Sequence, residues 1–378
     1  MAGLYLHIPF CRKRCHYCDF YKTTEVRQKP LFLEMVVREA ELQAQYLGGE
    51  SLETLYFGGG TPSVLTPEEV RFLMEKAGTF FCVEKEAEVT MEVNPDDMTP
   101  GKAALYRAAG VNRLSIGIQS FHDHLLKVMN RRHNGRQSRE AVTRAAEEGF
   151  DQISLDLIFG LPGMTLREWE ESLDQALALP VNHISAYHLT YHEGTPFYDR
   201  LLRGTLTEAA EEESLEQFSL LMDKTRAAGF EQYEISNFAL NGAYSRHNSA
   251  YWSGRKYLGL GPSAHSYNGM SRQWNRANLS HYLHALEKGT IPAEMEILTP
   301  ADRLNDYLIT RLRTRWGISM AIMARDFGDA VASAVMEEAL PFLEEGTLVS
   351  DGDILRLSPA GIMVSDRILL ALIREKIS

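Results

Sequence analysis

The chain has few cysteines and no long hydrophobic run. Only 4 of its 378 residues are cysteine, which is too few for a disulfide framework in a chain of this length. Met1 to Phe10 shows no basic segment followed by an apolar one, and no later stretch is long and apolar enough to span a membrane. We therefore expect a cytoplasmic protein without a transmembrane segment.

Positive charge is scarce as well. The 39 Lys and Arg residues are outnumbered by 51 Asp and Glu residues, which gives a net charge of -12. The basic residues do not gather in a stripe, as they do in proteins that bind a phosphate backbone. This balance argues against a nucleic-acid partner.

The first two thirds of the chain instead alternate short β-rich runs with amphipathic helical stretches. This alternation is typical of parallel strands joined by crossover helices. Six strands are predicted, at 4–8, 55–57, 89–93, 113–118, 153–158 and 183–188. The first helix should bury one apolar stripe, made of Leu33, Val36, Val37, Ala40, Ala44 and Leu47. Helix starts are expected at Thr66-Pro67 and at Thr99-Pro100.

The alternation ends near Phe238, so we expect three parts. Residues 1–238 should form the α/β barrel part, 239–299 a loop-rich region, and 300–378 a smaller α+β unit. The last unit should contain a hairpin at 347–357 and a helix at 359–373. Helices with a hairpin also occur in DNA-binding winged helices, but acids outnumber bases after Thr299, which disfavours that reading.

Three of the four cysteines, Cys11, Cys15 and Cys18, follow the first strand within eight residues. Iron-sulfur clusters are normally held by four thiolates, so three cysteines leave one iron with an open position. A zinc site is the alternative, because nearby histidines at 7 and 16 are also suitable ligands. Cys82 stands alone among apolar residues and is expected to be buried.

Two further motifs lie where predicted strands end, which is where αβ barrels carry their chemistry. Gly58 to Pro62 follow the second strand, and Glu92 closes the third. Glycines there let the backbone approach a ligand closely, although a simple tight turn explains them equally. Glu92 also fits a helix cap or a surface ion pair.

The cysteine spacing resembles that of the radical SAM superfamily, and nearly the whole chain is similar to the oxygen-independent coproporphyrinogen III oxidase family. The matching segments, besides the cysteine cluster, are Tyr5-x-His7-Ile8-Pro9-Phe10-Cys11, Gly58 to Pro62, Arg113 to Phe121, Asp156 to Gly163 and Gly194-Thr195-Pro196. The resemblance implies a partial (β/α)6 radical-SAM barrel with a 4Fe-4S cluster on Cys11, Cys15 and Cys18. It also implies S-adenosylmethionine at the open iron, contacted by Tyr5, Tyr17, Gly60, Thr61, Glu92, Gln119, Arg131 and Asp156.

Within this family the sequence resembles the heme-chaperone branch more than the true oxidases, which decarboxylate two propionates. The oxidases carry a further cysteine two residues after the third ligand, where this chain has Phe20, and an extension ahead of the Tyr-x-His motif. The resemblance associates a His-Asn-x-x-Tyr-Trp signature with heme, here His247, Asn248, Tyr251 and Trp252. A neutral imidazole is a good axial ligand and aromatic rings pack on a porphyrin, but a hydrogen-bonded packing role remains the alternative.

The resemblance therefore implies a heme chaperone, with heme as cargo and respiratory hemoproteins as acceptors, in which no residue is catalytic. It leaves peripheral membrane contact and a homodimer open. A coproporphyrinogen III dehydrogenase, a radical SAM oxidoreductase, is the competing interpretation. A zinc-stabilised nucleic-acid-binding module is a third, disfavoured by the acidic balance and the barrel pattern.

Overall fold

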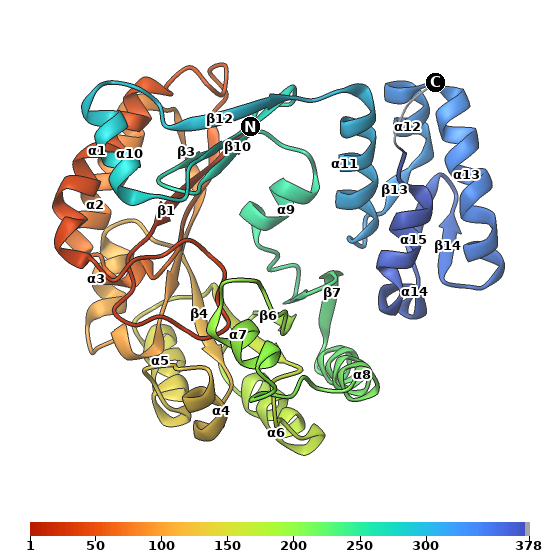
Figure 1. Ribbon diagram of the computed structural model, residues 1–378, viewed down its shortest axis with the longest axis horizontal. Helices are drawn as coiled ribbons and strands as arrows, with labels where there is room; N and C mark the ends of the chain where they lie inside the picture. The colour runs from red at the N-terminus through yellow and green to blue at the C-terminus, as the bar shows by residue number, and fades with distance from the viewer. Residues whose placement is uncertain (375–378) are drawn as a thin grey trace.

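The computed structural model describes residues 1–374, and one large mixed sheet forms its framework (Figure 1). In these residues the sheet has 12 strands in the order β12-β11-β10-β9-β1-β2-β3-β4-β5-β6-β8-β7. The strands from β9 through β6 in that order are all parallel, and the others are antiparallel. The parallel strands are β1 (Ala2–Ile8), β2 (Leu52–Gly59), β3 (Val83–Val93), β4 (Arg113–Gln119), β5 (Ile153–Phe159), β6 (His183–His188) and β9 (Tyr257–Leu260).

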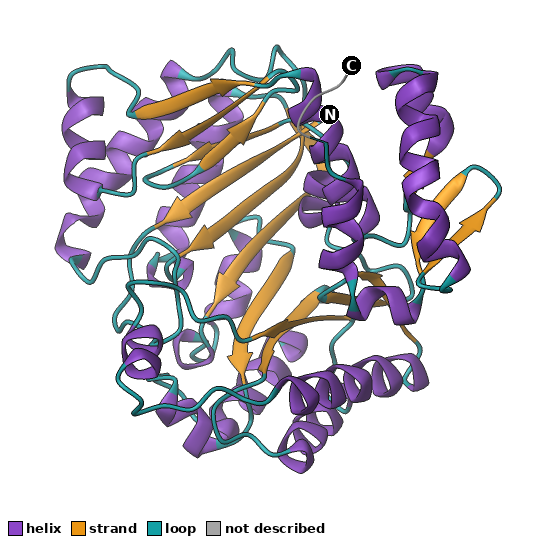
Figure 2. Cartoon of the chain, turned by 45° about the vertical axis from the view of Figure 1, so that its right-hand side comes forward, coloured by secondary structure: helices purple, strands orange, loops and turns teal. Residues whose placement is uncertain are grey.

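The six predicted strands are confirmed as β1 to β6, and the expected partial barrel is confirmed with them. Helices pack along one face of the curved sheet and leave the other face concave (Figure 2). These helices follow the strands in turn: α1 (Lys29–Leu42), α2 (Pro67–Phe80), α3 (Lys102–Ala108), α4 (Asp123–Val128), α5 (Gly135–Glu147), α6 (Leu166–Leu177), α7 (Pro196–Leu202) and α8 (Glu211–Ala227). The strand ends that carry the motifs therefore meet at one edge of the barrel.

Local sequence signals explain some of the helix boundaries and fail at others. Thr66 caps α2 as expected, in a capping box with Glu69. The predicted start at Thr99 is wrong, because α3 begins at Lys102. Glu148, from a distant turn, accepts the backbone N–H groups of Gly101 (2.7 Å) and Ala104 (2.9 Å) and replaces a local cap. The first helix is also shorter than its apolar stripe, since it ends before Ala44 and Leu47.

Residues 239–299 hold more regular structure than the loop-rich region that we expected. They contain α9 (Arg246–Trp252), the parallel strand β9, strands β10 (His265–Tyr267), β11 (Ser271–Asn275) and β12 (Ala293–Ile297), and helix α10 (Leu279–Glu287). Strand β9 pairs with β1 and extends the sheet past the first strand. On the opposite edge, β8 (Asn237–Leu240) and β7 (Phe230–Glu234) close the sheet.

The C-terminal part has a hydrophobic core of its own, separate from the core of the sheet. It contains α11 (Pro300–Leu312), β13 (Ile318–Ser319), α12 (Met320–Phe327), α13 (Asp329–Glu344), β14 (Leu348–Asp351), β15 (Ile354–Leu357), α14 (Pro359–Met363) and α15 (Ser365–Leu372). The predicted hairpin is present, whereas the predicted final helix is broken at Val364 into α14 and α15. Residues 375–378 of the expected 300–378 unit lie outside the described residues, and the three-part division stays a prediction.

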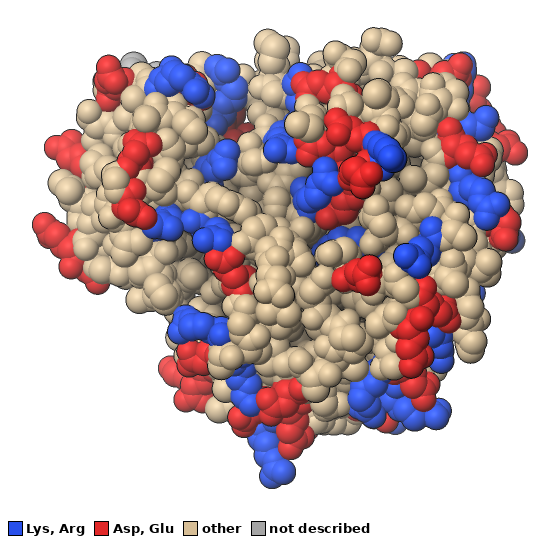
Figure 3. All heavy atoms as spheres, turned by 180° about the vertical axis from the view of Figure 1, so that it is seen from behind, with Lys and Arg blue, Asp and Glu red and all other residues tan. Residues whose placement is uncertain are grey.

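The surface carries mixed charge. On the face shown in Figure 3, Lys and Arg side chains lie among Asp and Glu and form no continuous basic surface. Cys82, which we expected to be buried, is exposed, because it lies in the short turn between α2 and β3. No helix within residues 1–374 is long and apolar enough to cross a membrane.

Candidate functional site

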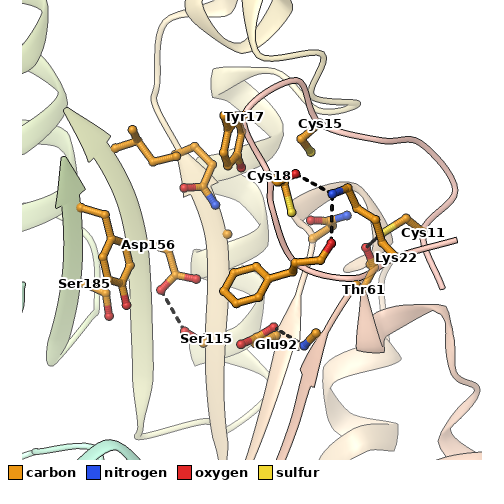
Figure 4. Close-up of a pocket in the computed structure, with 18 of the residues that line it drawn as sticks. Cys11, Cys15, Tyr17, Cys18, Lys22, Thr61, Glu92, Ser115, Asp156 and Ser185 are labelled. Carbon is orange, nitrogen blue, oxygen red and sulfur yellow. Dashed lines mark hydrogen bonds between the residues drawn. The ribbon is translucent and has the colours of Figure 1, made fainter. Parts of the chain in front are cut away.

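The three clustered cysteines line one cavity of about 490 Å³ at the carboxyl edge of the parallel strands. They lie on the loop that follows β1, and Figure 4 shows all three on the same side of the cavity. Two hydrogen bonds within the loop hold its conformation. Cys11 N–H donates to Thr23 O at 2.8 Å, and Lys22 Nζ donates to the carbonyl of Cys18 at 2.6 Å. The backbone thus presents three thiols to one space.

The glycine turn after β2 runs directly beneath this loop. A Cβ atom on Gly60 would lie 2.9 Å from the backbone of Pro9 and 3.0 Å from the carbonyl oxygen of Ile8. Only glycine therefore fits between the turn and the loop. The next residue, Thr61, donates its hydroxyl to Cys11 Sγ at 3.3 Å. The turn accordingly braces the first cysteine as well as forming the floor of the cavity.

Two partly buried carboxyl groups face the same cavity from neighbouring parts of the sheet (Figure 4). Glu92, on β3, accepts Tyr56 O–H at 2.9 Å and Gly59 N–H at 3.2 Å. Asp156, on β5, accepts Ser115 O–H at 2.9 Å. Burial, with the charge of Asp156, raises the pKa of Glu92 to about 8, and burial raises the pKa of Asp156 to about 6. Such a pair favours a cationic ligand, which would relieve the cost of ionising them.

A partly buried arginine, Arg131, joins the carboxylate side of the cavity to the cysteine loop. Arg131 donates through Nη2 to Asn94 Oδ1 (2.7 Å) and to Gly117 O (2.6 Å), and its Nη1 lies 3.5 Å from Cys15 Sγ. Its Nε is buried without a hydrogen-bond partner. Gln119, beside it, has a backbone φ of +67° at an irregularity between β4 and β5. An unpartnered donor and a strained backbone at one spot are typical of a ligand site.

The side chains expected to contact S-adenosylmethionine gather at this cavity with one exception. Those that line it are Tyr17, Gly60, Thr61, Glu92, Gln119, Arg131 and Asp156. Tyr5 lies behind the wall, stacked on Tyr56 with ring centroids 5.9 Å apart. Lining residues that the sequence did not single out include Tyr56, Asn94, Ser115, Tyr187 and His188. Asn94, Tyr187 and His188 lie at strand ends, whereas Tyr56 and Ser115 lie within β2 and β4, and nothing in their spacing marks them.

The histidines of the zinc alternative are engaged elsewhere. His7 Nε2 lies 2.9 Å from the carbonyl oxygen of Tyr21, and His16 Nδ1 lies 2.9 Å from the carbonyl oxygen of Val128. Neither side chain lines the cavity that holds the cysteines. Two other histidines do line the cavity, but His188 Nε2 lies 3.0 Å from Ser214 Oγ and His192 Nε2 lies 3.5 Å from Asp19 Oδ2. The clustered thiols are thus without His7 and His16, which fits an iron-sulfur cluster with an open iron better than a closed zinc site.

The four residues expected to bind heme lie on α9, on the concave side of the sheet, and they do not share a pocket. Asn248 lines the cysteine cavity, whereas His247 is 2% exposed and both of its ring nitrogens are hydrogen-bonded. Tyr251 packs edge-on against His247, and the Arg313 guanidinium covers one face of Trp252 at 4.7 Å. In this conformation the group offers no free imidazole nitrogen for heme, and one face of Trp252 is covered.

Known proteins that resemble this chain share its fold and the part of the chain that forms the cavity. The family model described as Radical SAM superfamily matches residues 5–176, which include the cysteine loop, Glu92 and Asp156. That described as HemN C-terminal domain matches residues 298–364. The solved structure of coproporphyrinogen III oxidase (HemN) from Escherichia coli superposes with a TM-score of 0.85, over 99% of this chain and 90% of that one, at 23% identity. Fold and cavity together define a radical SAM protein.

Relatives of similar length narrow this class further. Heme chaperone HemW of Bacillus subtilis is 34% identical over 99% of this chain and 100% of its own length. A protein of the same name from Mycobacterium tuberculosis is 35% identical over 98% of this chain and 94% of its own length. The mitochondrial radical S-adenosyl methionine domain-containing protein 1 of Bos taurus is 32% identical over 98% of this chain and 87% of its own. The chain belongs to the HemW family.

Proposed function

We propose that this protein is a cytoplasmic heme chaperone that carries a 4Fe-4S cluster with S-adenosylmethionine and delivers heme to respiratory hemoproteins. The similarity to proteins named heme chaperone HemW over nearly the whole chain supports this proposal. The observation in the structure that carries it is Phe20. Its side chain is 63% exposed and lines the cysteine cavity, at the place where the resembled oxidases have a further cysteine.

The cavity has the groups that the proposed cofactors need. Cys11, Cys15 and Cys18 would supply the thiolates, and a cluster with an open iron supplies a binding place for S-adenosylmethionine and an electron for its sulfonium. Glu92 and Asp156 would neutralise the positive charge of the methionyl part. The residues that we assign to S-adenosylmethionine are Tyr17, Gly60, Thr61, Glu92, Gln119, Arg131 and Asp156, with Tyr5 acting from behind the wall.

The heme ligands are less well defined. A heme on His247 would require α9 to reorganise, because the ring is buried and both nitrogens are occupied. Heme remains the proposed cargo of the chaperone.

The alternative enzyme, a coproporphyrinogen III dehydrogenase, is favoured by the shared fold alone. One paired experiment separates the two functions. The anaerobically reconstituted protein is given coproporphyrinogen III with S-adenosylmethionine and a reductant, and a second sample is titrated with hemin. We expect about one hemin bound per chain and no repeated turnover. Multiple equivalents of protoporphyrinogen per chain would contradict the chaperone and support the enzyme.

A further inference from the structure

Helix α9 is fastened to the strands that carry the cofactor cavity. The backbone N–H groups of Arg246 and His247 each donate to one oxygen of the Glu88 carboxylate, on β3, at 2.9 Å. Ser245 caps the helix by accepting the N–H of Asn248 at 3.2 Å. Figure 1 shows α9 on the concave side of the sheet, apart from the outer helices. The helix is therefore held against the inner face of the sheet by bonds to its first turn.

The imidazole of His247 is locked by hydrogen bonds on both sides. Its Nδ1 lies 2.7 Å from the hydroxyl oxygen of Thr54 on β2, and its Nε2 lies 2.9 Å from the hydroxyl oxygen of Tyr251. Burial lowers the pKa of His247 to about 3, so the ring is neutral. A neutral imidazole has one donor and one acceptor nitrogen, and here both have partners.

The same ring packs face to face on the wall of the cavity. Its centroid lies 4.8 Å from that of Tyr56, with 25° between the two planes, and 6.3 Å from that of Tyr5. The ring also lies close to Gly3 on β1, where an added Cβ atom would be 3.3 Å from His247 Cε1. His247 and Tyr5 thus fix the plane of the Tyr56 ring from behind.

Tyr56 connects this packing to the proposed cofactor-binding carboxyl group. Its ring lines the cavity, and its hydroxyl donates to Glu92 Oε1 at 2.9 Å. A contiguous series of contacts therefore runs from His247 through Tyr56 to Glu92. Asn248, the next residue of α9, lines the cavity directly.

We propose that His247 is a positioning residue of the S-adenosylmethionine cavity, which acts by holding Tyr56 and, through its hydroxyl, the Glu92 carboxylate. This inference rests on the proposed role of Glu92 in binding S-adenosylmethionine. It assigns the histidine of the His-Asn-x-x-Tyr-Trp signature to the cofactor side of the protein. The imidazole cannot ligate iron and keep both of its present hydrogen bonds. Any ligand that removes it from Tyr56 would then weaken S-adenosylmethionine binding, and S-adenosylmethionine would weaken that ligand by the same factor.

The test is the affinity of the full-length, anaerobically reconstituted protein for S-adenosylmethionine, measured by calorimetry and by the change that it causes in the EPR spectrum of the reduced cluster. His247→Ala removes the stacked ring, and we expect the dissociation constant to rise roughly 10-fold. Tyr56→Phe, which removes only the hydroxyl, should have an effect of similar size. His247→Phe keeps a flat ring against Tyr56 and should restore most of the affinity.

A double-mutant cycle tests the route of the effect. If His247 acts through the Tyr56 hydroxyl, His247→Ala with Tyr56→Phe should bind S-adenosylmethionine about as weakly as either single variant. Additive losses would overturn the proposal. Wild-type affinity in both His247 variants would overturn it as well. If His247→Ala does not fold, Tyr56→Phe and His247→Phe still test the proposal. Wild-type affinity for S-adenosylmethionine in Tyr56→Phe would contradict an effect that passes through the Tyr56 hydroxyl.

Matched controls separate positioning from general damage. His284→Ala removes a histidine of α10 whose side chain is 65% exposed, and it should leave both affinity and cluster iron unchanged. Hemin titration of the same variants distinguishes this proposal from the proposed function. If wild type does not bind hemin, the chaperone function fails while the cofactor result stands. If the Soret band is lost in both His247 variants while S-adenosylmethionine binds normally, His247 is a heme ligand and the positioning role is wrong.

Discussion

The carboxyl group of Glu92, which is desolvated in the wall of the cavity, should make the cofactor-free protein less stable as the pH rises. Its pKa is about 8 in the folded chain, against an ordinary value of 4.5, chiefly because burial disfavours the charged form. The unfolded chain therefore releases this proton at a lower pH than the folded one. Stability associated with Glu92 is fully present below about pH 4.5, falls as the pH rises toward 8, and levels off above that.

Replacing Glu92 by Gln removes this titration and keeps nearly the same shape. Each pH unit between the two pKa values corresponds to about 1.4 kcal/mol. From pH 6 to pH 8 the free energy of unfolding of Glu92→Gln should thus gain about 2 kcal/mol on that of wild type, because the titration begins to level off near pH 8. The same variant should bind S-adenosylmethionine poorly, since an amide cannot neutralise a cation.

The assay is thermal unfolding of cluster-free wild type and Glu92→Gln across pH 6 to 8, read as the difference between the two proteins. The control is Glu140→Gln on α5, whose side chain is 46% exposed, and which should follow wild type at every pH. A constant difference between wild type and Glu92→Gln over this range would refute the raised pKa.

Three further predictions concern the cluster, the cavity and the sheet. Cys15→Ser should lose most of its cluster, so iron and sulfide analysis that finds a full complement would exclude this thiolate as a ligand. The lysine in Arg131→Lys cannot form all of the hydrogen bonds that Arg131 makes to Asn94, Gly117 and Cys15. Titration should therefore show roughly 10-fold weaker S-adenosylmethionine binding with the cluster retained. Equal affinity would contradict the role of Arg131 in binding S-adenosylmethionine. Glu39→Ala removes the carboxylate that accepts hydrogen bonds from the buried donors of Asn275, Gly261 and Tyr282. Chemical unfolding should show a free energy of unfolding lower by about 3 kcal/mol, with faster hydrogen exchange in β9 to β11. An unchanged midpoint would contradict this prediction.

The parts of the fold that were predictable are those with a local cause. Alternating strands and amphipathic helices located β1 to β6, and Thr66 with Glu69 located the start of α2. The prediction of a helix start failed where a residue distant in sequence supplies the cap. The carboxylate of Glu148 caps α3, so the Thr99-Pro100 signal has no effect there. Strand β9 forms by pairing with β1, and its own four residues carry little indication of that.

The candidate site shows the same division. The cysteines and the glycine turn lie where β1 and β2 end, and Glu92 lies at the end of β3, so the parallel pairing of these strands brings them together. The sequence could not show that His247 would be buried between Thr54 and Tyr251, because that depends on where α9 lies against β2. The chemistry of imidazole left an axial heme ligand and a hydrogen-bonded packing role both open, and tertiary packing turns this ring toward Tyr56.

The proposed function requires that the protein binds heme and transfers it to an acceptor protein. The most direct test is to load the reconstituted protein with one equivalent of hemin, add a stoichiometric excess of a heme-free respiratory hemoprotein, and follow the Soret bands of donor and acceptor. If the protein delivers heme, heme should move to the acceptor faster than it does from free hemin or from hemin on serum albumin. Transfer no faster than from albumin, or heme retained by the protein throughout, would contradict it.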